Sequence, residues 1–202
     1  MQTRQARQPT ESRQSEIVAT LVRLSAERSS AEITTAEIAK AMNLTQGALF
    51  RHFPTKEAIR LAVVAWIEEC LLQRLNESRR QAATPLQALE AMFLAHVGFV
   101  IEHPGAPRLI FGELQQPADS PLKHRVNRLI QRYHALLGEV LDEAAERRDI
   151  PPDCDRGAAA ALFLGAIQGL VMQAMLLGNT EQLLDKARAV FALYRRGLEA
   201  RP

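Results

Sequence analysis

The sequence has few residues of the kinds that interrupt helices or cross-link small folds. Its 202 residues include only 10 glycines, 10 prolines, two cysteines and 5% aromatic residues. Runs of β-branched residues are absent too, so a sheet protein is not expected. Cys70 and Cys154 lie far apart without metal-ligand spacing, which argues against a disulfide scaffold or a zinc site. These absences favour an all-α protein with reduced thiols, although a redox switch at either thiol stays open.

Catalytic motifs are missing as well. The chain has no P-loop and no Ser/His/Asp or Cys/His arrangement that would suggest an activated nucleophile. We therefore expect no enzyme activity, cofactor or metal. The first residues, MQTRQARQPTESRQ, are polar and lack the apolar stretch of a signal peptide, so a cytoplasmic location is expected.

Charge of neither sign dominates, because the net charge is only +2. Its distribution is uneven, however. Residues 1–60 contain nine Lys or Arg and six Glu, and the rest of the chain is slightly negative. A modest local excess is sufficient for phosphate contacts, since these contacts are short-ranged. The N-terminal part is therefore the candidate for binding nucleic acid.

The most informative segment covers residues 34–56, TTAEIAKAMNLTQGALFRHFPTK. Thr34 and Glu37 have the spacing of a capping box, which begins a helix. Ile38 and Met42 give this helix a short apolar face. Asn43 follows at the point where the chain must turn, and asparagine tolerates left-handed backbone well.

A second short helix is expected from about Thr45 to about His52. Pro54 disfavours helix at its own position and at the preceding residue, so the helix must end there. Thr55 then caps a third helix that begins with Lys56. Two short helices around a tight turn make a helix-turn-helix, whose second helix fits the DNA major groove.

The outward face of the second helix carries side chains suited to reading bases. Arg51 favours guanine, Gln46 favours adenine, and Gly47 lets the backbone approach closely. The ring of Phe50 can contact a thymine methyl group. An ordinary solvated helix face is the alternative interpretation.

Groups suited to holding phosphates flank this face. Thr45 has a hydroxyl, His52 has a ring nitrogen, and Lys56 stands at a helix start, where N–H groups favour anions. Thr35 occupies the equivalent place at the preceding helix start. The phosphate candidates are therefore Thr35, Thr45, His52 and Lys56.

These motifs resemble those of the TetR (tetracycline-repressor) family of one-component regulators. The match covers residues from about 12 to 60 and includes Thr-x-x-Glu-Ile-Ala, then Leu-Thr-x-Gly-x-Leu-Phe-x-His-Phe-x-x-Lys-Glu. Phe50 departs from the family's more usual Tyr and lacks its hydroxyl. The resemblance implies an all-α fold with an N-terminal arm and three-helix DNA-binding domain (1–56). A C-terminal helical ligand-binding and dimerisation domain (57–202) follows.

Helical periodicity extends along the chain outside the helix-turn-helix. We expect helices over residues 12–28, 56–79, 85–102, 108–115, 122–147, 155–177 and 180–198. Residues 1–11 are expected to form an arm. Arg4 and Arg7, with Arg13 just beyond it, either reach a DNA minor groove or remain solvated.

Residues 157–178 form an uncharged run of 22, long enough to span a bilayer. The run lacks a companion segment and contains two glutamines, so a helix buried on all sides is favoured. Small residues recur every fourth position, and the last helix has an apolar stripe. Two such helices from each subunit would form a four-helix dimer interface, as the resemblance also implies. Its candidates are Gly157, Ala161, Gly165, Gly169, Val190, Phe191 and Tyr194.

The resemblance also implies a ligand pocket in the C-terminal domain. Apolar and polar residues that can line it are Trp66, Met92, Phe93, His96, Phe99, Phe111, Gln168 and Met172, and less specifically Met175. Most of these side chains are equally suited to a hydrophobic core. Such a lining suits a small molecule that is mainly apolar or aromatic.

We therefore expect a ligand-responsive, homodimeric transcriptional regulator with double-stranded operator DNA and a small effector as partners. Repression of a palindromic operator, relieved by the effector, follows from the family's tendency. Two alternatives stay open. One is a regulator of the same build switched by thiol oxidation, and the other is a helical small-molecule binding protein or enzyme with a vestigial helix-turn-helix.

Overall fold

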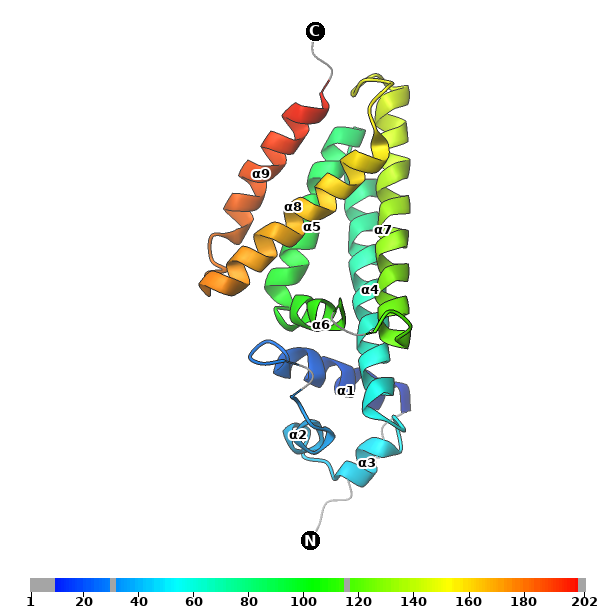
Figure 1. Ribbon diagram of the computed structural model, residues 1–202, viewed down its shortest axis with the longest axis vertical. Coiled ribbons are helices and arrows are strands. Elements are labelled where there is room, and N and C mark those ends of the chain that lie inside the picture. Colours follow the sequence, from blue (N-terminus) through cyan, green and yellow to red (C-terminus); the bar gives the residue numbers. More distant parts are fainter. Residues whose placement is uncertain (1–9, 30–31, 115–116, 200–202) are drawn as a thin grey trace. The chain divides into compact units, whose positions relative to one another are not determined.

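The structure is a computed structural model that describes residues 10–29, 32–114 and 117–199. About 78% of the described residues are helical, and they form no strand (Figure 1). The expected all-α class is thus confirmed. The N-terminal arm lies outside the described residues, except that its last two residues already belong to the first helix.

The helices follow one another with short connections. They are α1 (Thr10–Leu24), α2 (Thr35–Ala41), α3 (Gln46–Phe50), α4 (Lys56–Gln81), α5 (Pro85–Glu102), α6 (Gly105–Leu114), α7 (Pro121–Glu146), α8 (Arg156–Leu177) and α9 (Leu183–Leu198).

Several helix bounds differ from the sequence expectation, and tight turns account for two of the differences. The first helix ends at Leu24 rather than residue 28, because Ala26 N–H donates to the Arg23 carbonyl in a three-residue turn. The last helix begins at Leu183 rather than residue 180, after a similar turn onto Thr180. Such turns continue the apolar periodicity without continuing the α-helical ladder. Another difference is at α6, which begins at Gly105 rather than residue 108.

The chain divides into two compact units that interleave in sequence. The first unit comprises Met1–Ile67 and His103–Val126, and the second comprises Glu68–Glu102 and Asn127–Pro202. A single cut after residue 56 therefore does not describe the packing. The start of α4 and the whole of α6 pack with the N-terminal helices, since their buried side chains complete that core.

The first unit is built around aliphatic side chains from α1 to α4. Ile17, Leu21, Ile38, Leu49 and Ile59 are each 0% exposed. α6 joins this unit by packing against α1. A charged pair also links α6 to α4, because the guanidinium of Arg60 donates to the carboxylate of Glu113, which is 1% exposed.

Gly105 allows an unusually close approach between α6 and α1. A Cβ atom built on it would lie 1.9 Å from the carbonyl oxygen of Val22 and 2.9 Å from the amide nitrogen of Ala26. Both atoms are backbone and cannot rotate away. The two helices therefore meet backbone to backbone, and only glycine fits there.

The second unit is a helical bundle with an aromatic core. In it α5 packs against both α8 and α9, which lie side by side (Figure 1). Phe93 and Phe163 meet edge to face at a centroid distance of 5.1 Å, and Phe163 meets Tyr194 at 5.6 Å. The Tyr194 hydroxyl donates to the Ala159 carbonyl at 3.1 Å. These ring contacts hold α5, α8 and α9 together.

The α4 and α7 segments of the second unit are linked by ion pairs. Arg132 Nη1 lies 2.6 Å from a carboxylate oxygen of Glu68, which is 2% exposed. Arg79 pairs with Glu139 farther along the same two helices. Because Glu68 is buried, its pairing fixes the register of the two helices more than it adds net stability.

By length and composition alone, α8 could cross a membrane. Its most apolar window has a mean hydropathy of 1.9, and 39% of that window is buried inside the chain. A core or interface helix meets the same criteria, so one such helix is weak evidence for a membrane span.

We expect Gly105→Ala to destabilise the protein by roughly 2 kcal/mol or more, because the added methyl group meets backbone on α1. Gly112→Ala on the same helix is the matched control, since a Cβ there meets no atom within 4 Å. That change should be neutral or stabilise by up to about 1 kcal/mol through helix propensity. Urea unfolding of both variants measures this, and equal midpoints would contradict the close contact.

Candidate nucleic-acid interface and effector region

The capping box expected at the start of α2 is present. Glu37 N–H donates to the Thr34 hydroxyl at 3.2 Å, and Thr34 N–H donates to the Glu37 carboxylate at 2.7 Å. Arg28 adds an ion pair to the same carboxylate at 2.8 Å. The hydrogen bonds from Thr34, and then Arg28, lower the pKa of Glu37 to about 2. The ionised carboxylate of Glu37 thus stabilises the start of α2.

The turn after α2 is a Schellman motif. Asn43 has φ of 54°, which is left-handed backbone. Leu44 N–H donates to the Ala39 carbonyl at 2.8 Å, and Asn43 N–H donates to the Lys40 carbonyl at 3.1 Å. These two bonds satisfy carbonyls that the helix end leaves free. The expected reversal at Asn43 is confirmed.

Helix α3 begins after Thr45, whose hydroxyl accepts a hydrogen bond from Ala48 N–H at 3.2 Å. It has 5 residues, Gln46–Phe50, and is shorter than the eight expected. Arg51 still has helical dihedral angles, φ −68° and ψ −24°, so it continues the turn. Beyond it, His52 N–H donates to the Leu49 carbonyl in a three-residue turn. The approach to Pro54 therefore ends the regular helix earlier than its side-chain pattern suggests.

One side of α3 is buried and the other is open to solvent. Leu49 is 0% exposed and anchors the helix in the first unit. Gln46, Gly47 and Arg51 are exposed, as is Phe50 at 40%. The four base-reading candidates are thus the side chains that the packing leaves outward.

A hydrogen bond joins the starts of the two short helices. Gln46 Nε2 donates to the Thr35 hydroxyl at 2.7 Å. The structure therefore brings a base-reading candidate and a phosphate candidate into direct contact. The bond orients the Gln46 amide before any DNA is bound. Sequence spacing gives no signal for this pairing, because it depends on how α2 and α3 cross.

The other two phosphate candidates stand at the exit of α3. His52 is half-buried, its carbonyl accepts from Gln14 Nε2 at 3.0 Å, and its Nδ1 is enclosed without a hydrogen-bond partner among the described residues. If His52 contacts a phosphate, as the sequence predicts, it does so through Nε2. Lys56 is the first residue of α4, where the Thr55 hydroxyl accepts from Ala58 N–H at 3.0 Å. Partial burial, and then the charge of Arg60, lower the pKa of Lys56.

The effector candidates do not form one group. Met92, Phe93 and Phe99 are buried in the second unit on α5, where His96 also lies. Trp66 and Phe111 belong to the first unit, and there the Trp66 ring meets His103 edge to face at 5.0 Å. Gln168 and Met172 are exposed on α8, so they do not face the core of their own unit. Only the α5 set is gathered around one core.

The dimer candidates divide into exposed and buried residues. On α8, Gly157, Ala161 and Gly165 are exposed and Gly169 is half-buried, while Val190 on α9 is also half-buried. The sequence predicts Phe191 and Tyr194 at the dimer interface, but they are only 2% and 6% exposed and belong to the chain's own aromatic core. Large apolar side chains extend the open surface, namely Leu162, Met172, Leu176, Leu177 and Leu193.

Among the described residues, no three His, Cys, Asp or Glu side chains are grouped so as to hold a metal ion. Cys70 and Cys154 are free thiols of intermediate exposure. Burial, and then the nearby Glu69 charge, raise the pKa of the Cys70 thiol. A raised pKa disfavours the reactive thiolate, which weighs against a redox switch at Cys70.

A capped helix, a Schellman turn and a short second helix with an open polar face make a helix-turn-helix, and here it precedes a helical bundle. This arrangement defines a DNA-binding protein of the helix-turn-helix class. The chain belongs to the TetR family. The family model for bacterial regulatory proteins of the tetR family matches residues 17–63, and the model for the tetracyclin repressor-like C-terminal domain matches residues 115–191.

Relatives with assigned roles include the nucleoid occlusion factor SlmA. The protein from Vibrio cholerae is 28% identical over 146 residues, covering 72% of this chain and 74% of its own. SlmA from Cronobacter sakazakii is 29% identical over 160 residues, covering 79% and 81% respectively.

Solved structures share the fold over nearly the whole chain. The fatty acid degradation regulator FadR from Bacillus halodurans has a TM-score of 0.83 at 19% identity, covering 98% of this chain and 100% of its own. FadR from Bacillus subtilis in complex with stearoyl-CoA has 0.81 at 20% identity, covering 92% and 99%. The ketosteroid regulator KstR2 of Mycobacterium tuberculosis has 0.77 at 19% identity, covering 94% and 96%. At these identities the likeness shows the fold alone.

The low pKa of Glu37 makes the α2 start sensitive to acid. Its folded pKa of about 2 lies below the ordinary 4.5, so its stabilising contribution is present above pH 4.5 and is lost as the pH falls toward 2. Glu37→Gln should remove this part of the pH dependence. Hydrogen exchange of the α2 amides in both proteins across this range measures the effect. A difference between the two proteins that does not change with pH would contradict it.

Proposed function

We propose that this protein is a homodimeric repressor. In this proposal it binds a near-palindromic operator through α3 and leaves it when a small, mainly apolar molecule binds. The observation that carries the proposal is the open face of α3, where Gln46, Gly47 and Arg51 are exposed beside a buried Leu49. Packing leaves outward the groups that can hydrogen-bond base edges.

In the proposed complex, α3 lies in the major groove. Arg51 donates to a guanine, and Gln46 bonds an adenine while its orientation is supported by Thr35. Gly47 permits close approach, and the Phe50 ring packs against a thymine methyl group. Thr45, His52 and Lys56 bind the flanking phosphates. Contacts to phosphates fix the position of the protein on the DNA without specifying its sequence.

Dimerisation is proposed to occur through α8 and α9. The exposed side of α8 presents Gly157, Ala161 and Gly165, and it continues into leucines that are 61–80% exposed at Leu162, Leu176 and Leu177. An open apolar surface next to a row of small residues suits close contact with a second copy. Two copies would place two α3 helices on successive turns of DNA, about 34–36 Å apart.

The effector acts, in this proposal, by favouring a dimer whose two α3 helices have a different separation. Its effect on DNA affinity is limited to its differential affinity for the two forms. The structural relatives named for fatty acid and ketosteroid regulation are compatible with an apolar effector. The identity of the effector is not inferred from these relatives.

The SlmA relatives favour a second candidate, a DNA-binding nucleoid occlusion factor. The two candidates predict different consequences when the gene is deleted in its host. A repressor predicts raised transcription next to the binding sites, whereas an occlusion factor predicts division across unsegregated nucleoids with transcription unchanged.

Selection of bound sequences from a random duplex pool tests the proposal directly. Enrichment of a near-palindrome by the purified protein at moderate salt is the expected result. No enrichment by folded, dimeric protein would reject DNA recognition in the effector-free state, and with it the repressor mechanism.

We expect Arg51→Ala to weaken operator binding by about 1–3 kcal/mol and to relax the preference at one base position. Lys56→Ala should weaken all sequences alike and reduce the salt dependence by about one unit of slope. Arg80→Ala, an exposed position at the far end of α4, is the control. Fluorescence anisotropy against operator and scrambled duplexes gives these values. Unchanged specificity in the Arg51 variant would show that another residue contacts the base.

We expect Gly165→Gln to convert the dimer to monomer. A Cβ at Gly165 meets no atom of its own chain within 4 Å, so the subunit tolerates the side chain, whereas a closely packed helix of a second copy does not. Gly138→Gln on α7 is the matched control, because its Cβ also meets nothing within 4 Å. Sedimentation velocity at micromolar concentration separates the forms. If the Gly165 variant remained dimeric, the interface would have to be placed elsewhere.

A further inference from the structure

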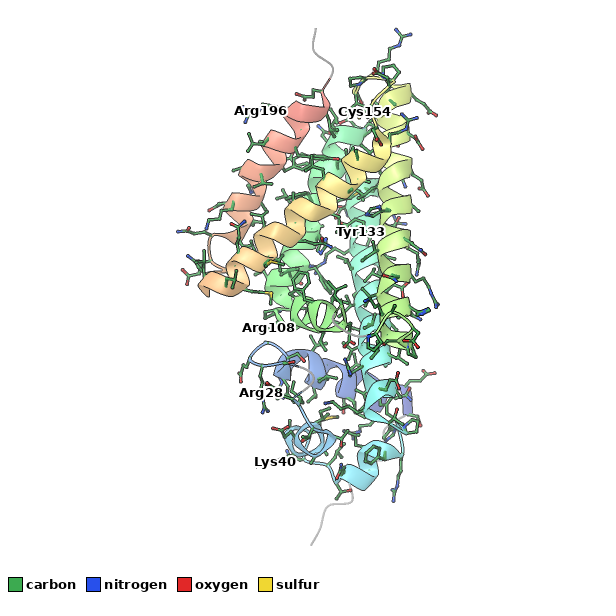
Figure 2. All side chains as sticks on the ribbon, in the orientation of Figure 1. Arg28, Lys40, Arg108, Tyr133, Cys154 and Arg196 are labelled. Atoms are coloured by element: carbon green, nitrogen blue, oxygen red, sulfur yellow. The ribbon has the colours of Figure 1, made fainter. Side chains whose placement is uncertain are left out.

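The aromatic core of the second unit contains a pair of polar side chains that bond to each other. His96 on α5 lies with its Nδ1 atom 3.1 Å from the Tyr133 hydroxyl, and the ring centroids are 5.5 Å apart. Tyr133 lies on α7, where Figure 2 labels it. The Tyr133 ring also meets Phe163 at 6.4 Å, and Phe163 meets Phe93 at 5.1 Å. On this side the pair is thus bordered by aromatic rings that offer no conventional hydrogen bond.

Both members of the pair are uncharged at neutral pH. Burial lowers the pKa of His96 to about 4, and burial raises the pKa of Tyr133. Desolvation is the cause in each case, and no neighbouring charge contributes to either shift. A charged group brought to this place would therefore find no opposite charge to offset its loss of hydration.

The second ring nitrogen of His96 is left with an unused hydrogen-bonding position. The bond to Tyr133 is the one that the His96 side chain makes within the described part of the chain. Tyr133 is only 2% exposed, but His96 has intermediate exposure. Nε2 of His96 does not belong to the fully enclosed polar atoms that lack a hydrogen-bond partner. Nε2 therefore retains surface that a water-sized molecule can touch, in a region deep enough to desolvate the ring.

Hydrogen bonding at Nε2 is required in either tautomer. If Tyr133 donates to Nδ1, Nε2 carries the proton and donates; if Nδ1 donates to the tyrosine oxygen, Nε2 accepts. A bound molecule that covers Nε2 with an apolar group leaves this nitrogen unmatched, which costs free energy, whereas a hydroxyl, carbonyl or amide group avoids that cost. A wholly apolar molecule bound against Nε2 would therefore bind more weakly than one with such a group.

We propose that Nε2 of His96 is the hydrogen-bonding point of the effector site, and that the effector is an uncharged, mainly apolar molecule with one hydroxyl, carbonyl or amide group. This inference rests on the proposed function, since it assigns chemistry to the effector. It excludes molecules that must place a carboxylate or phosphate against His96.

Three small probes of similar size test the charge and hydrogen-bonding requirements. p-Cresol is uncharged at neutral pH and has one hydroxyl, toluene lacks it, and benzoate is an anion. Each is titrated into the full-length protein while the side-chain nitrogens of its 5 histidines are followed by NMR. p-Cresol should bind saturably, shift the His96 nitrogens selectively, and bind about tenfold more tightly than toluene. Benzoate should bind most weakly.

Two variants and a control assign the preference to His96. His96→Phe should bring the affinities for p-cresol and toluene to within about twofold of each other, and His96→Gln, which retains a polar group, should restore part of the difference. His124→Phe, at an exposed position on α7, should behave as the wild type. The NMR shifts in the unmodified protein provide a readout if a variant does not fold.

The proposal is overturned if benzoate binds best, if the preference survives in His96→Phe, or if none of the probes binds the folded protein. Operator binding by the same samples separates this failure from failure of the proposed function. DNA recognition with no probe binding rejects the effector site alone, whereas probe binding at His96 without DNA recognition rejects the repressor.

Discussion

Every α-helix leaves four N–H groups at its start and four C=O groups at its end without partners inside the helix. A chain made of consecutive helices must satisfy these groups at each break, and in this protein short polar side chains and left-handed residues do so. The helix starts use Thr34, Thr45, Thr55 and Asp155, and the helix ends use Asn43 and Arg148. Because a cap fixes the direction in which the chain enters a helix, the caps around α2 and α3 decide which side of α3 is left open.

The features that follow from a few adjacent residues could be predicted from the sequence. The capping box at Thr34, the reversal at Asn43 and the helix starting at Lys56 are local, so spacing alone predicts them. The bounds of α5 were predictable for the same reason, since Thr84 and Pro85 mark its start and Pro104 follows its end. The resemblance to the TetR family added the assignment of roles, which stay predictions, and the family models confirm the family itself.

Features that depend on tertiary packing could not be predicted. Apolar periodicity shows that Phe191 and Tyr194 face a partner surface, but not whether that surface belongs to the same chain or to a second copy. Here both side chains are buried in the core of their own chain, because α9 packs on α5 and α8 through these two rings. The Gln46–Thr35 bond and the Gln14–His52 bond likewise join residues whose proximity depends on helix crossing. The same holds for α6, which follows α5 in sequence yet packs against α1.

The contact between α6 and α1 through Gly105 has a mechanical consequence. Most helix pairs meet through side chains, which rotate and so absorb small displacements between the helices. Here backbone meets backbone, and a peptide unit has no rotatable group at the contact with which to yield. A shift of α6 toward α1 must therefore be followed by α1 as a rigid body. Because side chains cannot absorb motion at this contact, even a displacement of a few tenths of an ångström at α6 moves α1, the helix that supports the DNA-binding core.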